Sequence, residues 1–428
     1  MLVDRLLQQK REIERRLQEP YVPRDVPLGR LSRELVNVVS GPRRAGKSFF
    51  ALHAVRELGR FGYVNFDDER LAVLEDYDEL VAAIDSTYGH PEVLLLDEVQ
   101  NLPSWELFVN RLQRQGVRLT ITGSNAHLLG SELATHLTGR YAQLVLFPFS
   151  FSEVLRSLGR ELTQPETAES LRSYAETGGY PEPLLKGIDR KEYLSTLVRA
   201  ILYKDIVVRH RIRSPQGLEG LARCLLSSIG QEYSGNRLAK ATGIGSVHSV
   251  EKYVGYLEEA FLFFTVRRFS WKVREQIRAN RKAYATDNGL IASGSFRSSA
   301  DRGRLLENLA AVALRKRELL GELELYFWKG PRQEEVDFVV KRGSRVAQLI
   351  QVCADTADPR TKERETRALL KAAEELGCAD LIVACDGPDS EEEVSWYGKK
   401  AVVRFVPLWK LLLDWERPAA EGAGAARE

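Results

Sequence analysis

The sequence predicts an α/β protein, because short apolar runs alternate with amphipathic segments over most of its length. Between residues 35 and 147, five apolar runs each have the length and β-branched content of a strand buried in a parallel sheet. Amphipathic segments separate them, as in a sheet covered by helices on both faces. A second series of strands and helices after residue 301 predicts a further α/β unit. The five runs are Leu35–Ser40, Tyr63–Phe66, Val93–Leu96, Leu119–Thr122 and Leu144–Phe147.

The remaining elements follow from spacing and composition. Four apolar residues at helical spacing, followed by three prolines, predict an N-terminal helix and a linker in residues 1–30. We expect the sheet-containing core at 31–150, an all-helical region at 151–212 and short helices followed by two strands at 213–295. The second α/β unit covers 296–414, and a flexible tail rich in Ala, Gly and Glu covers 415–428. The residues of the first helix and the prolines are Leu2, Leu6, Ile13, Leu17, Pro20, Pro23 and Pro27.

Length and composition limit the classes of protein. A chain of 428 residues is long enough for two to four domains. With 29% charged and 44% hydrophobic residues, it has the composition of an ordinary globular protein. The net charge of +2 excludes a polycation, so a nucleic-acid role must depend on a local basic patch.

The number and spacing of the cysteines, together with the hydropathy of the chain, indicate the cellular compartment. The four cysteines form no CxxC pair, which argues against a structural zinc site and a disulfide framework. No apolar run reaches about 18 residues, and the first 16 residues lack the apolar core of a signal peptide. We therefore expect a cytoplasmic protein without a membrane segment. The cysteines are Cys224, Cys353, Cys378 and Cys385.

A phosphate-binding loop is predicted between the first strand and the next helix. The segment GPRRAGKS fits G-x-x-x-x-G-K-[ST], and a strand precedes it while a helix follows it. In such a loop, backbone amides and the helix N-terminus bind phosphate oxygens. Lys47 would contact the β- and γ-phosphates of ATP, and the Ser48 hydroxyl would be a ligand of Mg²⁺. Lys47 is also the only lysine between residues 11 and 185. The residues of the loop are Gly41, Pro42, Arg43, Arg44, Ala45, Gly46, Lys47 and Ser48.

Polar residues end two of the predicted strands. The apolar run Val93–Leu96 is followed by Asp97 and Glu98. Asp97 suits the Mg²⁺ shell, and Glu98 is placed to orient or deprotonate a water, which favours hydrolysis. Ser124 and Asn125 follow another strand, whose end lies beside Glu98 if the strands are parallel. One of them would hold the attacking water, or would cap the next helix instead.

Several motifs together resemble a widespread prokaryotic family of AAA+-like P-loop ATPases. In that family the ATPase core is followed by a winged helix and a C-terminal domain of the restriction-endonuclease-like PD-(D/E)xK superfamily. The resemblance covers about residues 21–412. It implies a P-loop NTPase parallel-sheet core, a helical lid at 151–212, a winged helix at 213–295 and a nuclease-like α/β domain at 296–414. The motifs are VVSGPRRAGKS, LLLDEVQN, TITGSN, LTGRY, LFPFSFSEVL and GGYPEP.

The resemblance also implies roles for three residues. Asn125 corresponds to the sensor-1 residue, and Arg140 in LTGRY corresponds to an arginine finger that acts on the γ-phosphate, often of a neighbouring subunit. We therefore expect a homo-oligomer, a hexamer being one such assembly; an exposed Arg140 in a salt bridge is the alternative. Pro181 in GGYPEP corresponds to a lid proline near the adenine, unless this segment is a plain turn between helices.

Residues 236–282 predict a nucleic-acid-binding module. Two helices joined by a glycine turn have the order of a helix-turn-helix, with Val250, Tyr253, Val254 and Leu257 on the buried face of the second helix. A strand and a run of basic residues interleaved with Phe269 and Trp271 then suggest a wing that contacts DNA. Protein docking by a winged helix, with a solvated basic run, is the alternative. The expected DNA contacts are Ser246, His248, Lys252, Arg267, Arg268, Lys272 and Arg274, and the run continues to Arg278, Arg281 and Lys282.

The C-terminal unit retains only part of a nuclease motif. Glu307, Asp337 and Gln351 match the superfamily frame, but Cys353 occupies the position of its lysine. A thiol supplies no fixed positive charge, and the neutral Gln351 is a poorer Mg²⁺ ligand than a carboxylate. We therefore expect that the nuclease activity is lost, unless a lysine elsewhere, such as Lys362, replaces the missing one. A turn-flanking Asp337 and an exposed Glu307 without function are the alternative.

These observations favour a cytoplasmic Mg²⁺-dependent ATPase that remodels or moves along DNA. Two other functions stay open: a nucleotide-gated switch that recruits a protein partner without motor activity, and an ATP-regulated nuclease.

Overall fold

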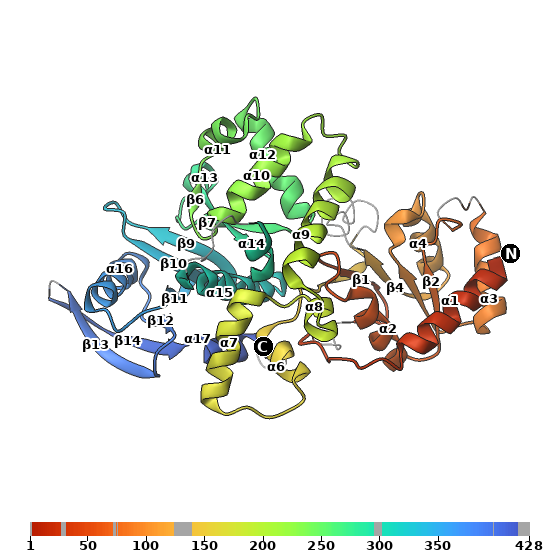
Figure 1. The fold of residues 1–428 in the computed structure, drawn as a ribbon, viewed down its shortest axis with the longest axis horizontal. Helices are drawn as coiled ribbons and strands as arrows, with labels where there is room; N and C mark the ends of the chain where they lie inside the picture. Colours follow the sequence, from red (N-terminus) through yellow and green to blue (C-terminus); the bar gives the residue numbers. More distant parts are fainter. Residues whose placement is uncertain are drawn as a thin grey trace. The chain divides into compact units, whose positions relative to one another are not determined.

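The computed structural model describes residues 2–26, 31–71, 74, 76–123, 139–294, 302–396 and 398–417. The chain divides into two compact units (Figure 1). The first contains the chain up to Pro148. The second runs from Phe149 to Arg417, apart from Glu259–Phe261. Among the described residues, no helix is both long and apolar enough to cross a bilayer.

The first unit is built on a five-stranded sheet in the order β2-β3-β4-β1-β5. All of its strand pairs are parallel, which confirms the prediction. The C-terminal ends of β1, β3 and β4 therefore lie at the same edge of the sheet. Strand β4 lies between β1 and β3. The strands are β1 (Val36–Ser40), β2 (Phe61–Asn65), β3 (Val93–Asp97), β4 (Arg118–Gly123) and β5 (Tyr141–Val145).

Helices pack on both sides of this sheet. The predicted N-terminal helix is α1 (Leu2–Arg16), and its Leu6 and Ile13 are buried in two separate clusters of the core. Burying two such side chains contributes about 1.5–3 kcal/mol each, which holds α1 against α3 and β2. The other helices are α2 (Lys47–Leu58), α3 (Tyr77–Tyr88) and α4 (Trp105–Arg114), and a 3₁₀ turn covers Val99–Asn101.

The second unit begins with helices. The all-helical prediction for 151–212 is confirmed, and a π-helical segment at Ile201–Val207 continues α9. The helices are α6 (Phe151–Ser157), α7 (Gln164–Thr177), α8 (Pro181–Lys186), α9 (Arg190–Ala200), α10 (Pro215–Ser227), α11 (Gly235–Thr242), α12 (Val247–Glu259), α13 (Val273–Arg278) and α14 (Asn288–Gly294). Beyond these lie α15 (Arg302–Leu319), α16 (Pro359–Leu376) and α17 (Leu408–Glu416).

A nine-stranded sheet connects the later part of this unit, in the order β13-β14-β12-β11-β10-β9-β7-β8-β6. Strand β7 pairs with β9 at Arg267 and Arg268, so the strands of the predicted wing and of the predicted nuclease-like domain share one sheet. The strands are β6 (Glu232–Tyr233), β7 (Phe263–Arg268), β8 (Arg281–Ala285), β9 (Glu324–Lys329), β10 (Glu335–Arg342), β11 (Arg345–Cys353), β12 (Leu381–Cys385), β13 (Ser390–Trp396) and β14 (Lys399–Pro407).

A buried polar cluster anchors the turn between α7 and α8. The Asp287 carboxylate accepts hydrogen bonds from the backbone amides of Gly179, at 2.7 Å, and Gly289, at 2.8 Å. Burial raises the pKa of Asp287 to about 6. Gly179 is required there because a Cβ at this position would lie 2.0 Å from the Phe149 carbonyl oxygen. The turn that precedes Pro181 is therefore held by contacts within the second unit.

Candidate nucleotide site and nuclease-like pocket

The loop between β1 and α2 has the form expected of a phosphate cradle. Gly41 has a φ of 142°, and a Cβ there would lie 2.1 Å from the Leu146 carbonyl oxygen, so only glycine fits. Gly46 is left-handed, with a φ of 92°, and immediately precedes α2. The N-terminus of α2 therefore lies at the loop, and a helix N-terminus favours the binding of a phosphate.

The Lys47 ammonium lies over this loop. Its side chain is only 4% exposed, and Nζ donates to the carbonyl oxygens of Gly41, at 3.1 Å, and Pro42, at 2.8 Å. The loop therefore surrounds a buried positive charge, as binding of β- and γ-phosphates requires.

Asp97 lies against Ser48 at the same edge of the sheet. Asp97 is 2% exposed, and its carboxylate is hydrogen-bonded by the Ser48 side chain. Burial raises the pKa of Asp97, and the hydrogen bonds from Thr122 and Ser48 oppose that rise. The two predicted Mg²⁺ ligands are therefore adjacent, and a hydroxyl beside a carboxylate is an oxygen donor set that fits the ion.

Sequence analysis missed two residues that hold Asp97. Thr122 donates from its hydroxyl to one carboxylate oxygen, and the Tyr63 hydroxyl donates to the other at 2.9 Å. Thr122 Oγ1 also accepts the backbone amide of Glu98 at 3.1 Å, so a single hydroxyl positions both acids. A polar residue at the end of a buried strand was the available signal for Thr122, but we assigned the polar end of that strand to Ser124 and Asn125.

Glu98 adopts an uncommon backbone conformation, with a φ of 52°. Such a conformation in a non-glycine residue is costly and is concentrated at functional sites. The Gln100 amide donates to the Glu98 carboxylate, and the side chain is half-buried. Glu98 thus follows Asp97 directly but leaves the direction of β3.

The linker before β1 also supports the loop, which sequence analysis did not predict. Arg24 donates to the carbonyl oxygens of Ala45, at 3.0 Å, and Phe147, at 2.5 Å. Tyr21 stacks on His53 of α2, with ring centroids 3.8 Å apart. The linker is therefore attached to the phosphate-binding loop, to α2 and to the chain that follows β5.

Arg140 lies at the opposite edge of the sheet from the loop. It is exposed, and its carbonyl oxygen accepts the amide of Val36, the first residue of β1. The loop begins after the last residue of β1, so the strand separates the two by about 16 Å. This distance is longer than an arginine side chain, so Arg140 does not contact the phosphate-binding loop of the same chain. Asn125 and Ser124 lie outside the described residues.

The predicted helix-turn-helix residues lie on α11 and α12. Val250, Val254 and Leu257 are buried, as expected, and Tyr253 is half-buried. Ser246 accepts the amide of Ser249 and so stabilises the start of α12. His248 and Lys252 are exposed, as are Arg267, Arg268, Lys272 and Arg274 of the predicted wing.

Pro181 begins α8 in the second unit, and its contact with adenine stays a prediction.

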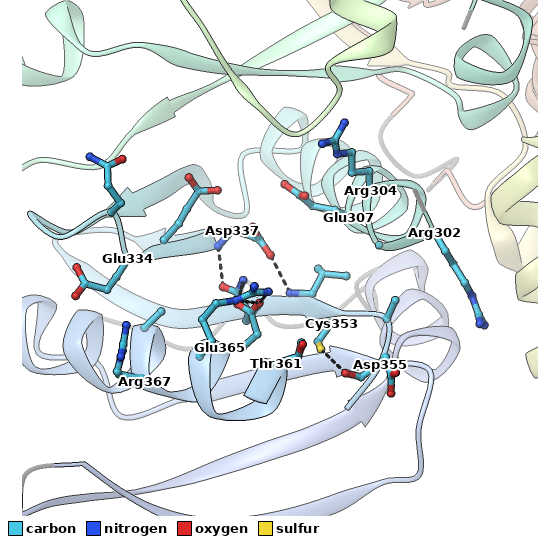
Figure 2. Close-up of a pocket in the computed structure, with 18 of the residues that line it drawn as sticks. Arg302, Arg304, Glu307, Glu334, Asp337, Cys353, Asp355, Thr361, Glu365 and Arg367 are labelled. Atoms are coloured by element: carbon cyan, nitrogen blue, oxygen red, sulfur yellow. Dashed lines mark hydrogen bonds and ion pairs between the residues drawn. The ribbon is translucent and has the colours of Figure 1, made fainter. Parts of the chain in front are cut away.

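The four residues of the nuclease-like motif lie together. Glu307, Asp337, Gln351 and Cys353 all line a cavity of about 950 Å³ (Figure 2). Gln351 accepts the Asp337 amide at 3.1 Å, and the Asp337 carboxylate accepts the Val352 amide at 3.0 Å. Burial raises the pKa of the Cys353 thiol to about 11, so this thiol stays neutral.

Lys282 is paired with three of the acidic residues that line this cavity. Its side chain is 1% exposed, and Nζ lies 3.1 Å from Glu307, 2.5 Å from Glu335 and 3.2 Å from Asp337. We had grouped Lys282 with the exposed basic run, and that assignment is wrong because β8 turns the side chain into the protein. Lys362 instead pairs with Glu392 at 2.7 Å and does not line this cavity.

The carboxylates around Lys282 outnumber its single positive charge. Burial and the neighbouring Asp337 raise the pKa of Glu307 to about 7. The described part of the chain contains no group of three or more His, Cys, Asp or Glu side chains arranged to hold a metal ion. The Lys282 ammonium lies within ion-pair distance of all three acids, so a metal ion would have to displace it, and the residues present do not fit one.

Comparison with known proteins identifies an AAA domain at residues 33–155. Two domains of unknown function match residues 168–299 (DUF8612) and 302–411 (DUF4143). Uncharacterized protein MJ1544 of Methanocaldococcus jannaschii is 31% identical over 414 residues, covering 92% of this chain and 91% of that protein. An uncharacterized protein of Haemophilus influenzae is 27% identical over 333 residues, covering 73% and 81%.

Solved structures are similar only at a distance. The Walker-type ATPase PABY2304 of Pyrococcus abyssi matches with a TM-score of 0.39 and 13% identity, over 67% of this chain and 94% of that one. Cdc6p from Pyrobaculum aerophilum matches with a TM-score of 0.29 and 13% identity, over 72% and 98%. Structural similarity at these TM-scores is too weak to support an inference about function.

The Thr122 hydroxyl should be required for turnover of ATP. We expect Thr122→Val to lower kcat about 10–100-fold with little change in ATP affinity, because Asp97 and Glu98 lose their shared hydrogen-bond partner. Thr122→Ser should restore the rate, and steady-state phosphate release measures it. Thr120→Val is the matched control: Thr120 is buried on the same strand, and its hydroxyl has no hydrogen-bond partner among the residues that the structure describes. Equal rates in the Thr122→Val and Thr120→Val proteins would exclude this positioning role.

Proposed function

This chain belongs to a family of P-loop ATPases that includes the M. jannaschii relative, and from that premise we propose that it hydrolyses ATP with Mg²⁺ to remodel or move along DNA. The contact between Ser48 and Asp97 is the observation that supports hydrolysis best. It joins the phosphate loop to the acidic end of β3, two segments that are far apart in the sequence.

Each residue of the site has a distinct part in the proposed reaction. Backbone amides of the loop bind the phosphates, and Lys47 stabilises the charge of the β- and γ-phosphates. Ser48 and Asp97 would hold Mg²⁺, which neutralises charge on those same phosphates when it is bound. Glu98 orients the attacking water and accepts its proton. We keep the assignment of Asn125 as a second residue that positions this water.

The basic wing supports the choice of DNA. Arg267, Arg268, Lys272 and Arg274 are exposed and lie close together in the sequence, and a polyanion neutralises such a group of cations. The helix-turn-helix order of α11 and α12 supports the same partner.

The alternative is a nucleotide-gated switch that recruits a protein partner. The ATPase rate with and without duplex DNA separates the two functions. A large increase in rate that falls steeply with salt favours action on DNA, and an unchanged rate favours the switch.

The position of Arg140 supports a homo-oligomer. Because Arg140 is too far from the loop of its own subunit, it would act on the γ-phosphate bound by a neighbour. A ring of subunits, such as a hexamer, brings every Arg140 to a neighbouring loop.

For the nuclease-like pocket we propose that cleavage has been lost. The Lys282 ammonium is already paired with the acids that would otherwise bind a metal, and we derive no cleavage step from them. The cavity would then serve as a binding surface.

We expect Glu98→Gln to retain ATP binding and to lose turnover about 10²–10⁴-fold, because an amide cannot accept the proton of water. Binding of ATP and release of phosphate are measured separately. Glu92→Gln is the matched control: it makes the same change at the other end of β3, where Glu92 pairs with Arg60 at 3.3 Å. Wild-type hydrolysis by the Glu98→Gln protein would refute the assignment.

Mixing two inactive variants should restore activity. Arg140→Ala and Lys47→Ala each remove a different half of a shared site, so mixed oligomers contain some sites with both halves intact. Phosphate release is measured for each variant alone and for the mixture. Arg118→Ala is the control, because Arg118 is also exposed and begins β4 at the same edge of the sheet. Failure of the mixture to exceed either variant would contradict action between subunits.

Removing Lys282 should create a metal site. Lys282→Ala leaves three carboxylates close together without their cation, so we expect Mn²⁺ to raise the unfolding temperature of this variant and not of the wild type. Lys341→Ala is the control, since it breaks an ion pair with Glu324 on the same sheet. The wild type should leave plasmid DNA intact. Cleavage by the wild type that Asp337→Ala abolishes would overturn the proposal, even if the Lys282 variant does not fold.

A further inference from the structure

The tip of the predicted wing presents apolar side chains to solvent. Trp271 is 58% exposed, Val273 65% and Ile277 62%. All three lie in the eight residues 271–278, which follow β7 and contain helix α13. We call these three side chains the apolar tip. Isolated exposed apolar residues are ordinary, but three together mark a contact surface.

The tip is held in place by its own contacts. Phe269 is buried, and its ring meets Trp271 at 5.0 Å and Tyr326 of β9 at 5.4 Å, edge to face in both cases. The Ser270 hydroxyl donates to Glu275 at 2.8 Å, and the Gln276 amide donates to the Ser270 carbonyl oxygen at 2.6 Å. These bonds fix the start of α13 on the end of β7, so the apolar tip projects from a rigid support.

Basic side chains surround the apolar tip. Val273 and Ile277 are four residues apart and share one face of α13, while Arg274 and Arg278 share the adjacent face. Arg267, Arg268 and Lys272 are also exposed, and Glu275 is the only carboxylate in this segment. The surface thus combines an apolar ridge with a row of cations beside it.

We propose that the apolar tip inserts into DNA at an unstacked base step while the flanking cations hold the phosphates. This inference deepens the proposed action on DNA and depends on it. Proteins that insert apolar side chains between base steps combine them with basic residues in this way. An aromatic ring such as Trp271 additionally gives an unpaired base a face on which to stack. The excess of cations over carboxylates complements a polyanion.

The cost of insertion determines the kind of DNA that is preferred. Opening a stacked step in an intact duplex costs free energy, and a bulge or a junction with a single strand has already lost that stacking. The apolar tip therefore favours DNA that contains unpaired bases. The cations contact phosphates in both kinds of DNA and give no such preference.

The test compares the full-length protein on an intact duplex and on the same duplex with a two-base bulge. We expect the wild type to bind the bulged duplex about tenfold more tightly, which corresponds to about 1.4 kcal/mol. Trp271→Ala should reduce this preference to near unity with little change in affinity for the intact duplex. Fluorescence anisotropy at one fixed salt concentration measures both affinities.

Two variants serve as controls. Leu107→Ala removes an equally exposed apolar side chain from the first unit, where Leu107 is 69% exposed, and should change nothing. Arg274→Ala should weaken both DNAs alike and lower the salt slope by about one.

The outcomes distinguish the inference from the proposed function. Equal affinities of the wild type for the two DNAs, or a preference that survives Trp271→Ala, would overturn the inference alone. Failure to bind either DNA would overturn the action on DNA as well. Trp271-dependent binding to phosphatidylserine vesicles without a preference between the DNAs would assign the tip to a membrane surface. The rate of ATP hydrolysis without DNA depends on none of these results.

Discussion

The buried carboxylate of Asp97 requires hydrogen-bond donors from several elements, and the nucleotide site is organised around that requirement. A charge without a partner is costly inside a protein. Here Ser48 of α2, Tyr63 of β2 and Thr122 of β4 contact it from three directions. These donors meet only because β3 lies between β2 and β4, with β1 next to β4. The order of the strands thus determines which side chains can hold the Asp97 carboxylate.

The nuclease-like pocket balances buried carboxylates in the opposite way. At Asp97 the partners are neutral hydroxyls, which stabilise the anion without cancelling its charge, so an added cation is still favoured. At Asp337 and Glu307 the partner is the ammonium of Lys282, a full positive charge that competes with any added ion. Two groups of acids in one chain therefore have different capacities for a metal, and the difference follows from the neighbours and not from the acids themselves.

Sequence analysis found the features that local patterns encode. The phosphate loop, the acidic end of β3 and all five strands of the first sheet depend on residues close together in the chain, and each was predicted near its observed place. Strands β13 and β14 were both missed, and the alternating, glutamate-rich sequence of β13 gives it only one apolar face. Helix α13 was missed because we assigned its basic residues to a wing.

Contacts between distant residues could not be predicted in this way. Lys282 precedes Glu307 by 25 residues and Asp337 by 55, and it belongs to a strand that we had assigned to a different domain. The pairing of β7 with β9 is what brings that strand to the pocket. Such a pairing depends on sheet register, which no local spacing contains. A lysine near these acids was expected further along the same domain, at Lys362, whereas the nine-stranded sheet places Lys282, from before that domain, among them. Buried charges in such proteins must therefore be sought across the whole sheet, since strands that share a sheet can share the partners of their buried side chains.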